Sequence, residues 1–138
     1  MTPTRSSCDE DTGVTLELRG HVLVVAMNRP HKRNAVNAEV SAALDAAFNR
    51  LEDDPEVWVG ILTGSPDVFS AGNDLVSGSG TPTARGGQYG LITRDRCKPL
   101  IAAVEGLALC AASICCWPAT SSLQQRLHSS AFPKSREA

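Results

Sequence analysis

The chain has 138 residues, a net charge of −2 at pH 7, and a composition that is 42% hydrophobic and 20% charged. This length and composition predict one modest globular domain with a hydrophobic core, and they exclude an intrinsically disordered chain. The near-neutral charge gives no reason to expect nucleic acid or an anionic membrane as a partner, and no apolar run reaches the roughly 18 residues of a membrane helix.

The first half of the chain predicts a regular order of strands and one helix. Residues 14–18 alternate apolar and polar side chains, as a half-buried strand does, and residues 21–27 and 57–63 are more continuous apolar runs. Between the second and third runs, Asn37 is placed to cap a helix that extends to about Glu52, with apolar residues at helical spacing. The order β-β-α-β therefore predicts a helix that crosses between strands.

The second half of the chain is less regular. Residues 77–87 are rich in Gly, Ser, Thr and Pro and predict a mobile loop, whereas residues 90–97 predict a short helix. Residues 100–104 predict a fourth strand. Within the strands we expect Trp58 to pack in the core, and we expect His21 to be a partnered surface histidine.

Domain boundaries follow from the same changes in composition. Residues 1–12 are polar and predict a disordered arm, residues 13–109 form the predicted core, and residues 110–138 lack any sustained period and predict a poorly ordered tail. The five cysteines have no zinc-site spacing and suit free thiols, so we expect no metal. No apolar secretion signal begins the chain, and a cytoplasmic location is the expectation.

Three sequence blocks in this order resemble the enoyl-CoA hydratase/isomerase (crotonase) family. Residues 28–35 read Asn-Arg-Pro-His-Lys-Arg-Asn-Ala, residues 68–75 read Val-Phe-Ser-Ala-Gly-Asn-Asp-Leu, and residues 98–109 read Lys-Pro-Leu-Ile-Ala-Ala-Val-Glu-Gly-Leu-Ala-Leu. The resemblance covers about residues 14–109. It implies an α/β fold, a partial crotonase-like spiral of β-β-α turns. The family continues into helices through which it trimerises, and this chain lacks them.

The resemblance implies a site for an acyl-CoA thioester that passes through an enolate. Backbone N–H groups aimed at the thioester oxygen stabilise the growing negative charge, and each such donor can contribute about 3 kcal/mol in the transition state. In the family the N–H of Ala71 is the first donor, Gly72 lets the ligand approach closely, and Asp74 fixes the turn, so Asn73 also falls in the substrate-binding turn. Taken alone, this turn is more often an ordinary glycine turn after a strand, and the two flanking blocks favour the family interpretation.

The basic block implies contacts with coenzyme A, which arrives as part of the substrate, so no separate cofactor is expected. Lys32 and Arg33 are candidate phosphate contacts, because their cationic side chains suit phosphate groups. Ala35 is a candidate backbone contact near the adenine. The alternative for these side chains is a solvated basic turn before a helix.

The third block ends where the family has three glycines and then a catalytic carboxylate. Here the aligned residues are Cys110, Ala111 and Ala112, and Ile114 stands at the carboxylate position. The N–H of Ala111 is the predicted second oxyanion donor, since any non-proline residue carries one. Ile114 has no proton to transfer, so we expect this chain to be inactive as a hydratase on its own.

We interpret the break after Leu109 as a shift of reading frame. When the third base of each codon is read as the first base of the next, residues 115–118 (Cys-Cys-Trp-Pro) translate only as Leu-Leu-Ala. Residues 111–120 are then compatible with the family's helix and its carboxylate, and residues 131–135 with the second carboxylate block. A divergent tail with its own packing is the alternative.

The resemblance therefore implies an enoyl-CoA hydratase/isomerase-like protein of fatty acyl-CoA metabolism. Two alternatives stay open. One is another reaction of the same superfamily, such as thioester hydrolysis or decarboxylation, because those enzymes share the oxyanion turn. The other is a non-catalytic fragment that binds acyl-CoA or pairs with an intact homologue.

Overall fold

The computed structural model describes residues 12–78 and 80–109. The predictions for the amino-terminal arm up to residue 11 and for the tail 110–138 lie outside the described residues. Within these residues there are two sheets, one long helix and two 3₁₀ turns. In chain order these are β1 (Val14–Arg19), β2 (Val22–Met27), η1 (Pro30–Lys32), α1 (Ala38–Asp53), β3 (Val59–Thr63), β4 (Val68–Ser70), η2 (Gln88–Gly90), β5 (Leu100–Ala103) and β6 (Leu107–Ala108).

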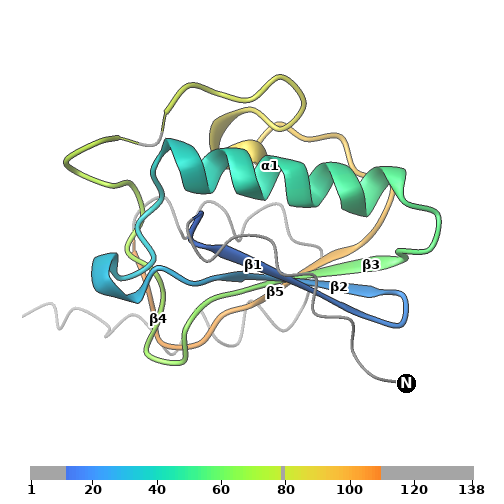
Figure 1. The fold of residues 1–138 in the computed structure, drawn as a ribbon, viewed down its shortest axis with the longest axis horizontal. Helices are drawn as coiled ribbons and strands as arrows, with labels where there is room; N and C mark the ends of the chain where they lie inside the picture. The colour runs from blue at the N-terminus through green and yellow to red at the C-terminus, as the bar shows by residue number, and fades with distance from the viewer. Residues whose placement is uncertain (1–11, 79, 110–138) are drawn as a thin grey trace, which may run out of the picture.

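The larger sheet has the order β1-β2-β3-β5, and α1 covers one of its faces (Figure 1). β1 pairs antiparallel with β2, whereas β2–β3 and β3–β5 are parallel pairs. The smaller sheet pairs β4 with β6 in parallel. The predicted β-β-α-β order is confirmed by this topology, because α1 makes the crossover between the parallel strands β2 and β3.

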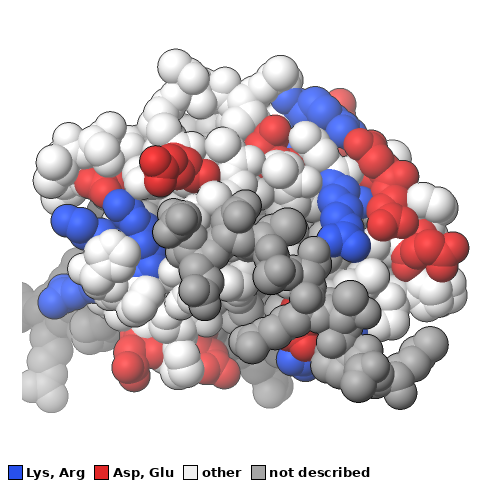
Figure 2. Space-filling view, in the orientation of Figure 1, with Lys and Arg blue, Asp and Glu red and all other residues white. Residues whose placement is uncertain are grey.

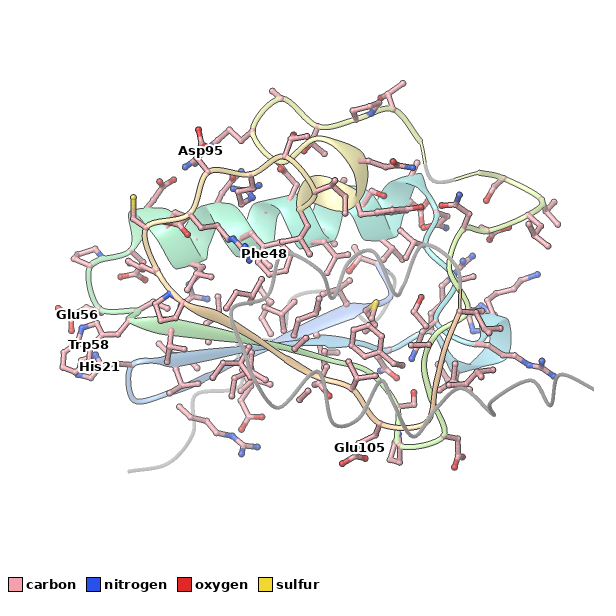
Figure 3. All side chains as sticks on the ribbon, turned by 180° about the vertical axis from the view of Figure 1, so that it is seen from behind. His21, Phe48, Glu56, Trp58, Asp95 and Glu105 are labelled. Carbon is pink, nitrogen blue, oxygen red and sulfur yellow. The ribbon has the colours of Figure 1, made fainter. Side chains whose placement is uncertain are left out.

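The core lies between α1 and the larger sheet. The helix buries apolar residues at three- and four-residue spacing, and Phe48 is fully buried beneath it (Figure 3). The predicted cap is present, since the Asn37 side chain accepts a hydrogen bond of 2.9 Å from the N–H of Val40. The helix ends at Asp53, two residues before Pro55, which disfavours helical geometry in the residue before it.

The prediction that Trp58 packs in the core is wrong. β3 begins one residue later, at Val59, and Trp58 is 61% exposed at the end of the sheet away from η1 (Figure 3). Its ring stacks on the imidazole of His21, with centroids 3.7 Å apart. His21 is the partnered surface histidine that the sequence predicted, because its Nδ1 also donates to the carbonyl oxygen of Glu56 at 2.6 Å.

The predicted helix over residues 90–97 is also absent. The structure instead has the 3₁₀ turn η2 over residues 88–90, and irregular turns follow it from Leu91. Gly90, the first residue of the predicted helix, has a φ of 71°, and Gly87 and Tyr89 just before it also have positive φ angles, which a right-handed helix excludes. The sequence pattern also missed β4 and β6, which are only three and two residues long.

Apolar side chains remain exposed at the outer strands β5 and β6, as expected for a partial spiral. Ile101 is 37% exposed, and Leu107 and Leu109 are 39% exposed. None of the helices in the described residues has the length and apolar character needed to cross a bilayer. The same residues contain no cluster of His, Cys, Asp and Glu side chains that would hold a metal ion.

Candidate functional site

Two segments far apart in the sequence lie side by side at one end of the molecule. The turn after β4 pairs with the chain that leaves η1, through hydrogen bonds from Val36 N–H to the Gly72 carbonyl (2.7 Å) and from Asp74 N–H to the Val36 carbonyl (3.0 Å). The pairing brings the first two resemblance blocks, residues 28–35 and 68–75, into direct contact.

Asn34 holds these two segments together from the inside. It is 2% exposed, and its Oδ1 accepts the N–H of Arg29 at 2.7 Å. Its Nδ2 donates to Ser65 Oγ (3.1 Å) and to the carbonyl oxygens of Val68 (3.0 Å) and Phe69 (3.2 Å). The side chain therefore ties η1 to β4, a role that the sequence analysis did not assign. Its φ of 55° is a conformation that Asn tolerates better than most residues.

A largely buried ion pair fixes the turn itself. Arg29 Nη1 lies 2.9 Å from Asp74 Oδ2, with side chains only 16% and 8% exposed, and the same nitrogen donates to the Ala35 carbonyl at 3.1 Å. The other oxygen of Asp74 accepts the N–H groups of Val76 (3.0 Å) and Ser77 (3.2 Å). The Arg29 guanidinium, and then these two N–H groups, hold the pKa of Asp74 well below its usual range.

We expect Asp74→Asn to lower the melting temperature by several degrees at neutral pH, because it removes the charge that Arg29 and the turn N–H groups stabilise. A carboxyl with a depressed folded-state pKa stabilises the fold above its unfolded pKa of about 3.9, and this contribution is lost as the pH falls toward the folded value. The difference between wild type and variant should therefore shrink below about pH 4. Thermal melts across pH 2.5 to 7 would measure it.

Asp67→Asn is the matched control for this prediction. Asp67 is exposed in the loop before β4, and its carboxylate forms no ion pair within the described part of the chain. The control should melt like the wild type at every pH. If Asp74→Asn also melted like the wild type at pH 7, the ion pair would not be fixing the turn.

A cavity of about 590 Å³ opens beside this turn. Its walls are Lys32, Ala35, Ala71, Asn73, Asp74, Leu75, Val76 and Leu109. Five of the predicted substrate-binding residues therefore meet at one cavity, from two separate blocks. Arg33 and Gly72 are not among the lining residues, but their carbonyl oxygens take part in the backbone pairing between the two blocks. Ala111 lies outside the described residues. The sequence analysis did not single out Leu75, Val76 and Leu109, which are mainly apolar surface at the cavity's edge.

The N–H of Ala71 is already engaged in this structure. It donates to the carbonyl oxygen of Arg33 at 2.9 Å, because the pairing between the two segments continues into the turn. The N–H of Gly72 donates to Ser70 Oγ at 3.1 Å. The role of Ala71 as first oxyanion donor stays a prediction, and it requires the bond to Arg33 to be exchanged for a bond to the ligand.

The charge around the cavity is mixed. Figure 2 shows Lys and Arg side chains gathered on the side of the molecule where η1 lies in Figure 1. Among the residues that line the cavity, Lys32 is the cation and Asp74 the carboxylate, and Asp74 is committed to Arg29. Glu105 is exposed and is not among the residues that line the cavity. The described site thus offers cationic and main-chain donors.

Comparisons with known proteins agree with the resemblance. The Enoyl-CoA hydratase/isomerase family profile matches residues 17–113. Enoyl-CoA hydratase EchA19 of Mycobacterium tuberculosis is 41% identical over 104 residues, which are 68% of this chain and 39% of that protein. A short-chain-enoyl-CoA hydratase of Clostridium acetobutylicum is 36% identical over 108 residues, covering 72% of this chain and 41% of that protein.

Solved structures match to a similar extent. An enoyl-CoA hydratase from Mycobacterium tuberculosis superposes with a TM-score of 0.72 and 39% identity, covering 79% of this chain and 44% of that one. Enoyl-CoA hydratase EchA1 from Mycobacterium marinum gives a TM-score of 0.72 at 40% identity, with the same coverage. The chain thus spans about two-fifths of the length of these relatives. On the strength of the family match, the fold and the residues at the cavity, the chain belongs to the enoyl-CoA hydratase/isomerase family and has its crotonase-like fold.

Proposed function

We propose that this chain binds an acyl-CoA thioester in the cavity beside the β4 turn, as an enoyl-CoA hydratase/isomerase-like protein of fatty acyl-CoA metabolism. One observation carries the proposal. Lys32 and Ala35 from one block and Ala71, Asn73 and Asp74 from another line the same cavity. Its volume of about 590 Å³ falls within the usual range for ligand sites.

The chemistry of the walls suits the parts of such a ligand. Leu75 and Val76 are 97% and 92% exposed, and with Leu109 they offer apolar surface to an acyl or pantetheine chain. Lys32 supplies a cation for a phosphate group at the edge of the cavity. The thioester oxygen would lie against the bare backbone of the Ala71 turn, where main-chain N–H groups stabilise an enolate.

We expect binding without hydration. The predicted second oxyanion donor is Ala111, and Ile114 stands where the resemblance places the proton-transferring carboxylate. General acid–base catalysis contributes about 10²–10⁴-fold to a rate, and an isoleucine cannot supply it. The hydration rate should therefore be lower by a factor of this size. Turnover of crotonyl-CoA at a rate well above the protein-free reaction would contradict this expectation.

Titration calorimetry with butyryl-CoA and with free coenzyme A tests the proposal. Lys32→Ala should weaken binding of both by about ten- to a hundredfold, because a hydrogen bond to a charged group contributes about 1.5–3 kcal/mol. Arg19→Ala is the control, since Arg19 is an exposed cation on β1 whose ion pair with Glu17 lies away from the cavity. Equal affinity of wild type and Lys32→Ala, or no binding by the wild type, would overturn the proposal.

Pairing with an intact homologue is the second candidate, and the outer strands favour it. β5 and β6 are edge strands of their sheets within the described residues. They carry the exposed Ile101 and Leu107, and the exposed Leu109 follows β6 directly. Unpaired edges with apolar side chains are templates for association with another chain. A purified full-length relative should then co-elute with this chain on a sizing column. Independent elution at micromolar concentrations would dismiss this candidate.

A further inference from the structure

Tyr89 reaches the cavity wall from a segment that the proposed function does not use. Its side chain is 3% exposed, and its hydroxyl donates a hydrogen bond to Asn73 Oδ1. Asn73 is exposed and lines the cavity, whereas Tyr89 lies behind it. The contact joins two residues sixteen positions apart and links η2 to the wall of the site.

The backbone at Tyr89 is held in an unfavourable conformation. Its φ is 58° and its ψ is 11°, in the left-handed region, which costs an L-residue energy unless its surroundings hold it there. Gly87 and Gly90 on either side also have positive φ, of 68° and 71°. A Cβ at Gly90 would lie 2.7 Å from the backbone of Asp45, so the segment is pressed closely against α1. Strain of this kind persists at positions with a role.

The helix α1 anchors the same segment. Arg94 is 8% exposed, and its Nε donates to the Gly90 carbonyl at 3.0 Å while its Nη1 donates to Asn49 Oδ1 at 2.6 Å. Its remaining nitrogen forms an ion pair with Asp45. Thr83 Oγ1 donates to the same carboxylate at 2.7 Å. The segment that carries Tyr89 is therefore fixed against α1 by largely buried polar contacts.

The hydrogen bond from Tyr89 determines which polar atoms of the Asn73 side chain remain available to a ligand. Because Oδ1 accepts from Tyr89, the amide nitrogen Nδ2 keeps its two N–H donors for another acceptor. The main-chain N–H of Asn73 also has no acceptor within the described residues. Asn73 adjoins the Ala71–Gly72 turn, so these donors lie at the part of the cavity where the proposed function places the thioester.

We propose that Tyr89 is a positioning residue, which holds the Asn73 amide so that its N–H donors bind the acyl-CoA ligand. The inference rests on the proposed function, since Asn73 acts on the ligand of that site. A tyrosine hydroxyl that only stabilised the fold would leave ligand affinity unchanged in a variant that stays folded.

A double-mutant cycle tests this inference. Calorimetry with butyryl-CoA would compare the wild type with Tyr89→Phe, Asn73→Ala and the double variant, and thermal melts would show that each is folded at the assay temperature. Each single variant should bind about three- to tenfold more weakly, the effect of one lost hydrogen bond. The double variant should bind no more weakly than Asn73→Ala alone, because both changes remove the same interaction.

Arg85→Ala is the matched control, because Arg85 lies on the same segment and pairs with the exposed Asp53 rather than with Asn73. It should bind like the wild type. Additive losses in the cycle, or unchanged affinity in Tyr89→Phe, would overturn the inference. If Tyr89→Phe did not fold, the Asn73→Ala variant would test the inference, because Asn73 is exposed and its substitution should leave the fold intact. Unchanged butyryl-CoA affinity in Asn73→Ala would also overturn the inference. A wild type that binds no CoA ester would instead refute the proposed function.

Discussion

Asn34→Ala is expected to lower the free energy of unfolding by about 3–5 kcal/mol, the largest effect of any single polar substitution at the site. The change removes three donated hydrogen bonds and leaves the carbonyl oxygens of Val68 and Phe69 without the Asn34 amide as their donor. It also removes the acceptor for the Arg29 N–H. Urea unfolding followed by circular dichroism would measure the loss.

Asn34→Gly separates the two causes of this effect. Asn34 has a φ of 55°, which glycine adopts freely and alanine does not. Glycine therefore loses the hydrogen bonds without the backbone strain, and it should be more stable than the alanine variant by about 1 kcal/mol. If both variants were as stable as the wild type, the side chain of Asn34 would not be holding η1 against β4. A loss confined to the alanine variant would assign the effect to backbone strain alone.

The regular elements could be predicted from the sequence because their signals are local and periodic. The helix α1 has apolar residues at helical spacing and Asn37 at its start, and both features appear in the structure. The segment after the loop could not be predicted in the same way. A helix was predicted over residues 90–97, but the positive φ of Gly90 and the contacts of Arg94 with α1 accompany a different backbone there.

At the candidate site, too, local sequence patterns predicted some features and missed those that depend on distant contacts. The residues predicted from the two blocks meet at one cavity because β4 and the chain after η1 pair with each other. Arg29 and Asn34 stood within the first block, but nothing in their spacing indicated an ion pair with Asp74 or a link to β4. Those roles depend on contacts between residues more than thirty positions apart, which a linear pattern does not contain.

The sequence predicted the position of the Ala71 turn but not its hydrogen bonding. The small residues after β4 were predicted to leave bare backbone beside a ligand, and the turn does line the cavity. Its N–H nevertheless donates to Arg33. A main-chain donor in a partly buried turn pairs with an acceptor, because an unpaired one is costly. A ligand oxygen that replaced the Arg33 carbonyl would exchange one hydrogen bond for another.

Gly106→Ala should lower the free energy of unfolding by more than about 3 kcal/mol, through a clash between two pieces of backbone. Gly106 links β5 to β6, with a φ of 67°. A Cβ there would lie 2.1 Å from the carbonyl oxygen of Asp67, the same oxygen that accepts the Leu107 N–H at 3.1 Å. Neither side of this contact is a flexible side chain, so relief requires β6 to move away from β4.

Gly20→Ala is the control that isolates the clash. Gly20 has a similar φ of 61° in the β1–β2 turn, and an added Cβ would meet no atom within 4 Å. It should cost only the left-handed strain of about 1 kcal/mol. Equal losses in the two variants would show that strain alone acts at Gly106. A larger loss at Gly106 should come with weaker binding of butyryl-CoA, because Leu109 follows β6 directly and forms part of the cavity wall.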